Sequence, residues 1–121
     1  MNRSILVVED QEDNRRIVRD LLSSRGFEII EATDGLAGVE AAKRHTPDLI
    51  LMDIQLPQID GYEATRRIKA DPDLAGIPII AVTSYALSGD DQKALDAGCD
   101  GYVAKPYSPR KLLATIENFL S

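Results

Sequence analysis

The chain has 121 residues, 44% apolar and 28% charged, which suffices for one folded domain without disulfides or a structural metal. Twenty acidic and fourteen basic residues give a net charge of −6, which argues against nucleic acid or an anionic membrane as a direct partner. A single cysteine, early acidic residues and no apolar run near ~20 residues predict one cytoplasmic domain over residues 1–121, without a secretory signal or membrane helix.

Short β-branched runs alternate with segments of helical periodicity along the whole chain. Strands are predicted, in chain order, at residues 5–8, 28–32, 49–52, 79–82 and 101–104. Three of these runs are nearly continuously apolar, which is typical of strands covered on both faces of a parallel sheet. Five strand–helix repeats therefore predict an α/β fold, a doubly wound parallel sheet with helices on both faces.

The helices between the strands are predicted from apolar stripes and from the residues that stop them. The first ends at Gly26, the second before Pro47, and the third begins after Asp60-Gly61. A weaker fourth spans about residues 88–97, and the last opens at Ser108-Pro109. The expected stripe residues, helix by helix, are Ile17, Val18, Leu21 and Leu22; Leu36, Val39 and Ala42; Tyr62, Thr65, Arg66 and Ile68; and Leu112, Leu113, Ile116 and Leu120.

Polar residues follow every predicted strand, but the second strand is followed only by Thr33 and Asp34, and the candidate site residues follow the other four. These candidates are Glu9 and Asp10, then Asp53, Thr83 and Lys105. Because ligands of parallel sheets bind beyond the carboxyl ends of the strands, we expect these side chains to meet at one edge. Individually each has an ordinary explanation, such as a helix-terminal acid, a turn aspartate or a surface lysine, so only their coincidence indicates a site.

The chemistry that suits this set is phosphoryl transfer to a carboxylate. Three converging carboxylates repel one another unless a cation is present, and oxygen-only ligands favour Mg²⁺. A carboxylate can attack phosphorus to give an aspartyl-phosphate, and a metal, a hydroxyl and an ammonium can then stabilise the charge of the transferring group.

The whole chain resembles the receiver domain of two-component response regulators. The segments that carry the resemblance are ILVVED at residues 5–10, PDLILMDIQLP at 47–57, Asp60-Gly61, AVT at 81–83 and AGCDGYVAKP at 97–106. It implies a flavodoxin-like (βα)5 fold with strand order 2-1-3-4-5, a stand-alone or excised single receiver domain, and a phosphorylation-activated switch rather than a turnover enzyme. Residues 52–57 are most similar to DivK-type regulators and to receivers of hybrid histidine kinases, and both origins stay open.

The resemblance implies a role for each matching residue. Asp53 is expected to be the phosphoacceptor, and Asp10, Asp53 and the backbone carbonyl of Gln55 are expected to bind Mg²⁺ with Glu9 behind them. Thr83 is expected to meet a phosphoryl oxygen and Lys105 to pair with one.

Further roles concern the conformational response. The ring of Tyr102 is expected to move inward on activation, and the Lys105–Pro106 peptide to be cis. Gln55 and Tyr85 are expected to set the phosphoryl lifetime.

The implied partners are a sensor histidine kinase or histidine phosphotransfer protein and a downstream protein target. The target is expected to bind the fourth helix, fifth strand and fifth helix. The kinase is expected on the first helix near Asn14 and Ile17.

Other classes fit the residues less well. A metal-dependent phosphohydrolase with an aspartyl-phosphate needs Asp-x-Asp after the first strand and a cap domain, whereas this chain has Glu9-Asp10-Gln11. A flavin carrier of the same fold needs a Ser/Thr/Gly-rich phosphate loop there. An inert binding module has no need of the full residue set.

Overall fold

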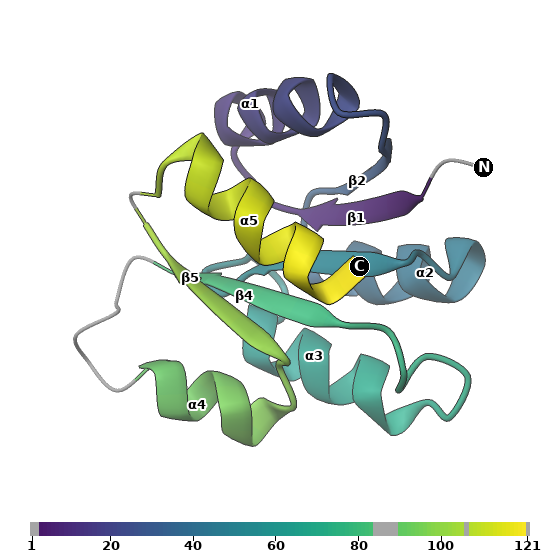
Figure 1. Ribbon diagram of the computed structural model, residues 1–121. Coiled ribbons are helices and arrows are strands. Elements are labelled where there is room, and N and C mark those ends of the chain that lie inside the picture. The colour runs from purple at the N-terminus through teal and green to yellow at the C-terminus, as the bar shows by residue number, and fades with distance from the viewer. Residues whose placement is uncertain (1–2, 84–89, 106, 121) are drawn as a thin grey trace.

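A computed structural model describes residues 3–83, 90–105 and 107–120. In this part of the chain, five parallel strands form one sheet in the order β2-β1-β3-β4-β5, as predicted (Figure 1). The strands are β1 (Ser4–Val8), β2 (Glu28–Ala32), β3 (Leu49–Asp53), β4 (Ile79–Thr83) and β5 (Gly101–Ala104). The central strands β3 and β4 are buried along their whole length, which explains their continuous apolar runs.

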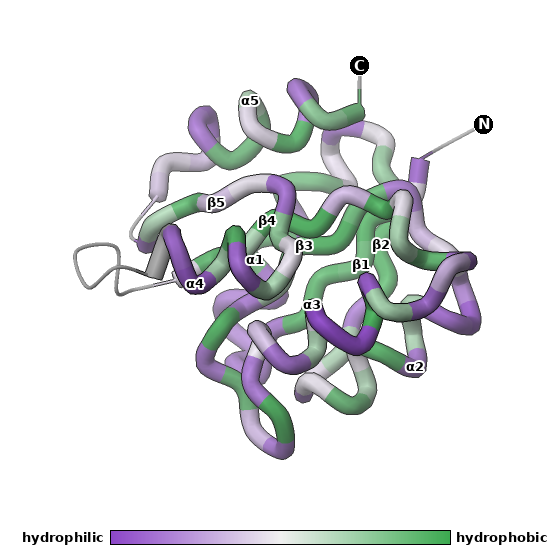
Figure 2. The backbone as a smooth tube through the Cα atoms, turned by 90° about the horizontal axis from the view of Figure 1, so that it is seen from below, coloured by the Kyte–Doolittle hydropathy of each residue, from purple (hydrophilic) through white to green (hydrophobic). Residues whose placement is uncertain are grey.

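Helices cover both faces of the sheet, so alternate strand residues enter two separate cores. The helices are α1 (Glu12–Ser23), α2 (Gly35–His45), α3 (Gly61–Ala70), α4 (Asp90–Ala97) and α5 (Pro109–Leu120). One core joins residues such as Leu6 and Met52 to α2, α3 and α4, and the other joins Val7 and Leu51 to α1 and α5. Figure 2 shows the apolar strands between helices of mixed polarity.

Two strands run one residue further than predicted, and this matters for the site. β3 includes Asp53 and β4 includes Thr83, so both polar residues are the last of their strands rather than the first of a loop. Their backbones are therefore fixed by the sheet, with Asp53 paired to Val82 and Thr83 to Ala104.

Six residues of the predicted stripes are not buried. Leu21 and Tyr62 are only half-buried, and Arg66 is exposed. Ile17 is 60% exposed because the buried face of α1 passes through Val18 and Leu22, about 100° away around the helix. Leu36 is 42% exposed, since it lines an open groove between α2 and α3. Leu120, in the last turn of α5, is only half-buried.

The described helices are all too short or too polar to span a bilayer. The start predicted for the fourth helix, near residue 88, lies outside the described residues, and the described helix is Asp90–Ala97.

Candidate functional site

Three carboxylates meet at the carboxyl edge of the sheet. Glu9 and Asp10 follow β1, and Asp53 ends β3, the strand beside it. One oxygen from each lies within 4.8 Å of the others, and Glu9 and Asp53 are buried while Asp10 is exposed. We call these three residues the acidic cluster. Its formation follows from parallel pairing, which brings the ends of β1 and β3 to the same edge.

Lys105, just after β5, reaches into the acidic cluster. Its Nζ lies 3.2 Å from Glu9 Oε1 and 3.2 Å from Asp53 Oδ2, and its side chain is 23% exposed. Its backbone N–H donates to the carbonyl of Thr83 at 2.7 Å, which anchors the residue to the end of β4. A single ammonium thus bridges two buried carboxylates from two other strands.

The charges at the site are unbalanced, because three carboxylates lie close to the single ammonium of Lys105. Burial raises the pKa of Glu9 above its ordinary value, and the hydrogen bond and charge of Asp53 raise it further. The pKa of Asp10 is also raised, first by partial burial and then by its interaction with Glu9. Burial alone lowers the pKa of Lys105, but the charges of Asp53 and Glu9 outweigh it and the pKa is raised.

The acidic cluster suits a hard divalent cation. Its donors are all carboxylate oxygens, of which the exposed Asp10 is accessible from solvent. Mg²⁺ prefers such ligands, and a second cation would relieve the repulsion that Lys105 alone leaves.

The backbone around Asp53 is tightly held. The Oδ1 atom of Asp53 accepts a hydrogen bond from the Gln55 N–H at 3.1 Å. The Gly61 N–H donates to the carbonyl of Ile54 at 2.9 Å. Asp60 caps α3 by accepting from the Glu63 N–H. A Cβ on Gly61 would lie 2.2 Å from the Asp53 carbonyl oxygen, so only glycine lets α3 begin this close to the site.

Thr83 and Tyr102 lie on neighbouring strands, as predicted. Thr83 is fully buried at the end of β4, next to the strand that carries Asp53. Tyr102 on β5 pairs with Ala81 on β4 and is half-buried against the core of α2, α3 and α4. Two further predicted residues, Tyr85 and Pro106, lie outside the described residues.

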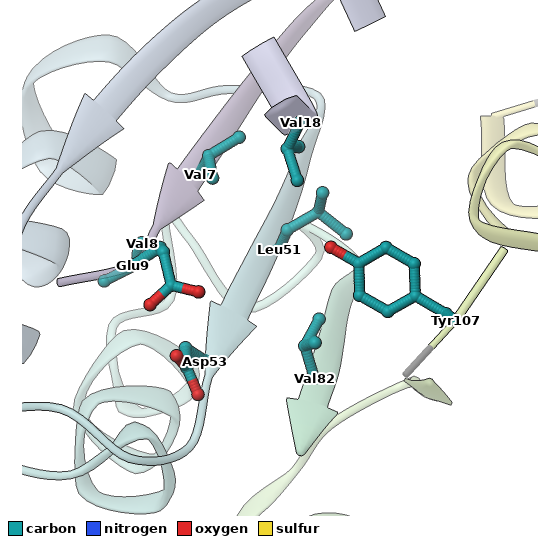
Figure 3. A pocket seen from close by; sticks show the side chains of 8 residues that line it. All are labelled: Val7, Val8, Glu9, Val18, Leu51, Asp53, Val82 and Tyr107. Atoms are coloured by element: carbon teal, nitrogen blue, oxygen red, sulfur yellow. The ribbon is translucent and has the colours of Figure 1, made fainter. Parts of the chain in front are cut away.

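Two neighbours of the site were not predicted from the sequence. The first is Tyr107, whose ring lies across a small cavity from Glu9 and Asp53, with its hydroxyl turned toward Leu51 (Figure 3). These residues enclose a cavity of about 20 Å³ together with Val7, Val8, Val18, Leu51 and Val82. Burial raises the pKa of the Tyr107 phenol. The second is Arg15, which donates to the main-chain carbonyl of Glu9 at 3.0 Å.

Comparison with known proteins decides the family. The sequence-family model of the response regulator receiver domain matches residues 5–117 of this chain. The polar-differentiation response regulators DivK of Brucella ovis and Brucella anthropi are each 43% identical over 120 residues, which is 99% of this chain and 98% of theirs. The chain belongs to the response regulator receiver family.

Solved receiver structures share the fold. The receiver domain of the sensor histidine kinase PA1611 from Pseudomonas aeruginosa PAO1, which has a magnesium ion coordinated in its active site cleft, is 38% identical with a TM-score of 0.93. The match covers 99% of this chain and 98% of that one. The chemotaxis protein CheY4 of Vibrio cholerae is 25% identical, with a TM-score of 0.92 over 98% of this chain and 99% of its own. This receiver domain is therefore a two-component signalling protein rather than a classical enzyme.

Proposed function

We propose that this receiver domain is a phosphorylation-activated switch that takes a phosphoryl group onto Asp53. The observation that carries the proposal is the Asp53 carboxylate, buried at a strand end between Lys105 and two further acids. The donor is a phosphohistidine of a sensor histidine kinase or of a histidine phosphotransfer protein. A cytoplasmic location accompanies the proposal, in keeping with the free Cys99.

The transfer is a substitution at phosphorus. An Asp53 oxygen forms a bond to phosphorus, and the bond from phosphorus to the imidazole nitrogen breaks, the nitrogen keeping the electron pair. Asp10, Asp53 and the carbonyl of Gln55 would hold Mg²⁺, with Glu9 behind them, and Mg²⁺ would neutralise charge on the phosphoryl oxygens. Lys105 pairs with one such oxygen, while the Thr83 hydroxyl donates to another.

The response follows from which strands carry these groups. Thr83 ends β4, and Tyr102 lies on adjacent β5, so a shift of Thr83 toward the phosphoryl group changes the space beside Tyr102. Phosphorylation then favours the state with the ring turned inward, and α4, β5 and α5 form the output surface for the target protein.

Two further roles complete the proposal. Gln55 is exposed beside Asp53, where its side chain can obstruct an attacking water and lengthen the phosphoryl lifetime. The exposed Ile17 on α1 gives the histidine-containing partner an apolar contact.

The first test is phosphorylation by a small-molecule donor with Mg²⁺. Intact-mass analysis should show one added phosphoryl group in the wild type and in D73A, which removes an exposed aspartate from the loop between α3 and β4. The variant D53A should gain none. Continued labelling of D53A would overturn the assignment.

A further inference from the structure

Arg15 links the backbone beside the acidic cluster to an edge strand. It lies in the first turns of α1, and its side chain is only 14% exposed. Its Nη1 donates to the carbonyl oxygen of Glu9 at 3.0 Å, and its Nε donates to Glu31 Oε1 on β2 at 3.2 Å. One planar guanidinium therefore joins α1, the end of β1 and β2.

With this contact, every polar group of Glu9 has a partner. Its N–H donates to the Ala32 carbonyl at 3.0 Å, and its carbonyl accepts from Arg15. Its carboxylate accepts from Lys105 Nζ at 3.2 Å and from the Gln11 N–H at 3.3 Å. The position of Glu9, and of Asp10 bonded to it, is thus fixed from both sides of the β1–α1 loop.

The hydrogen bonds of Arg15 oppose the electrostatic repulsion among the carboxylates of the acidic cluster. Three carboxylates with one ammonium repel one another, and two of the three, Glu9 and Asp10, lie in the loop after β1 rather than on a strand. We propose that Arg15 is a positioning residue that keeps Glu9 and Asp10 close to Asp53 and so preforms the cation site. The inference rests on the proposed Mg²⁺ site.

Charge and position give opposite effects on Mg²⁺ affinity, which makes the role testable. If Arg15 acted only through its positive charge, its removal would strengthen Mg²⁺ binding by reducing repulsion. If it positions the loop, its removal weakens binding. Arg19 supplies the matched control, because it also pairs with Glu31, at 3.2 Å, from the same helix, and none of its hydrogen bonds in the described residues reaches Glu9.

The experiment compares R15M and R19M, which lose the same charge. Mg²⁺ dissociation constants are measured by chemical-shift titration, and amide hydrogen exchange of Gln11 is measured without metal. We expect R15M to bind Mg²⁺ about tenfold more weakly and to exchange the Gln11 amide faster. R19M is expected to bind as tightly as the wild type or slightly more tightly, with unchanged exchange at Gln11.

R15K tests whether the planar guanidinium, which donates to Glu9 and Glu31 at once, is required. An ammonium can reach the Glu9 carbonyl or Glu31 but does not hold both in one plane, so intermediate affinity is expected. Equal or tighter Mg²⁺ binding by R15M than by R19M, with unchanged Gln11 exchange, would overturn the positioning role. A wild type that binds no Mg²⁺ would instead refute the proposed metal site, and the metal-free exchange would still decide whether Arg15 holds the loop.

Discussion

Lys105 is the only cation that contacts two members of the acidic cluster among the described side chains, so its loss exposes the repulsion that it offsets. For K105M without Mg²⁺ we expect the free energy of unfolding to fall by about 2 kcal/mol, less than the ~3–5 kcal/mol of a fully buried pair because the lysine is partly exposed. Added Mg²⁺ should restore much of this loss, since it supplies the missing positive charge. Chemical denaturation with and without Mg²⁺ measures both effects.

Lys69 provides the control for that prediction. Its Nζ pairs at 2.8 Å with Asp100, which precedes β5 and so lies at the amino ends of the strands, away from the acidic cluster. Its side chain is 18% exposed. K69M should also be less stable than the wild type, but Mg²⁺ should stabilise the two proteins by the same amount, so the difference between them remains. Equal recovery of both variants would mean that the cation does not replace Lys105.

The raised pKa of Glu9 predicts how stability depends on pH. A carboxyl group whose pKa is higher in the folded state stabilises the fold when protonated, below its ordinary 4.5, and this contribution is lost as pH rises through the raised value. Metal-free E9Q should therefore be more stable than the wild type at pH 7. The gap in melting temperature between E9Q and the wild type should narrow as pH falls from 7 toward the ordinary 4.5 of a glutamate, because the wild-type carboxyl takes up a proton above that pH.

Melting curves of both proteins in metal-free buffer across this range provide the measurement. The pKa of Asp10 is also raised, in part by Glu9, so the same comparison is repeated in the D10N background, where Asp10 cannot titrate. A gap that stays constant or widens on acidification would contradict the raised pKa of Glu9.

At the scale of elements, the start of α3 sets the backbone of Asp53. The close approach of Gly61 to the Asp53 carbonyl leaves no room for a methyl group, whereas a Cβ on Gly76 has nothing within 4 Å. We expect G61A to lose about 2 kcal/mol or more of stability and to weaken Mg²⁺ binding, because either α3 or Asp53 has to shift. G76A should change neither quantity appreciably. Chemical unfolding and Mg²⁺ titration of G61A and G76A measure both quantities. If G61A binds Mg²⁺ as tightly as the wild type, the start of α3 does not fix the position of Asp53.

How much of this was predictable differs between strands and helices. The meeting of Glu9, Asp53 and Lys105 follows from the sequence, because parallel strands end at one edge and each run had a polar residue at its end. The exposure of Ile17 and the contact between Arg15 and the Glu9 carbonyl did not follow. Both depend on how α1 is rotated against the sheet, and a one-residue difference on a helix turns a side chain by about 100°.

Tyr107 illustrates the same limit in a loop. The sequence places Tyr107 between the fifth strand and the fifth helix, but no periodicity predicts that its ring lines the same small cavity as Glu9 and Asp53. Its inward position depends on long-range packing against α1 and the sheet, which only the assembled fold defines.

At the scale of the whole molecule, we expect repulsion within the acidic cluster to lower the stability of the metal-free fold. Two carboxylates ~4 Å apart repel by about 4 kcal/mol at an effective dielectric near 20, and Lys105 offsets part of this. D53N removes one buried charge and leaves Glu9 paired with Lys105. We therefore expect its melting temperature without Mg²⁺ to exceed that of the wild type by about 4 °C, which corresponds to a net gain near 1 kcal/mol in a domain of this size.

Mg²⁺ should reverse the order of the two proteins. The wild type is expected to gain melting temperature with millimolar Mg²⁺, whereas D53N, which lacks one proposed ligand, gains little. D100N is the control, because Asp100 pairs with Lys69 and accepts from the Ile79 N–H, and it is not a member of the acidic cluster. It should melt below the wild type with or without Mg²⁺. Metal-free D53N that also melts below the wild type would show that the hydrogen bonds of Asp53 to Gln55 and Lys105 outweigh the repulsion, so that the cluster is not strained.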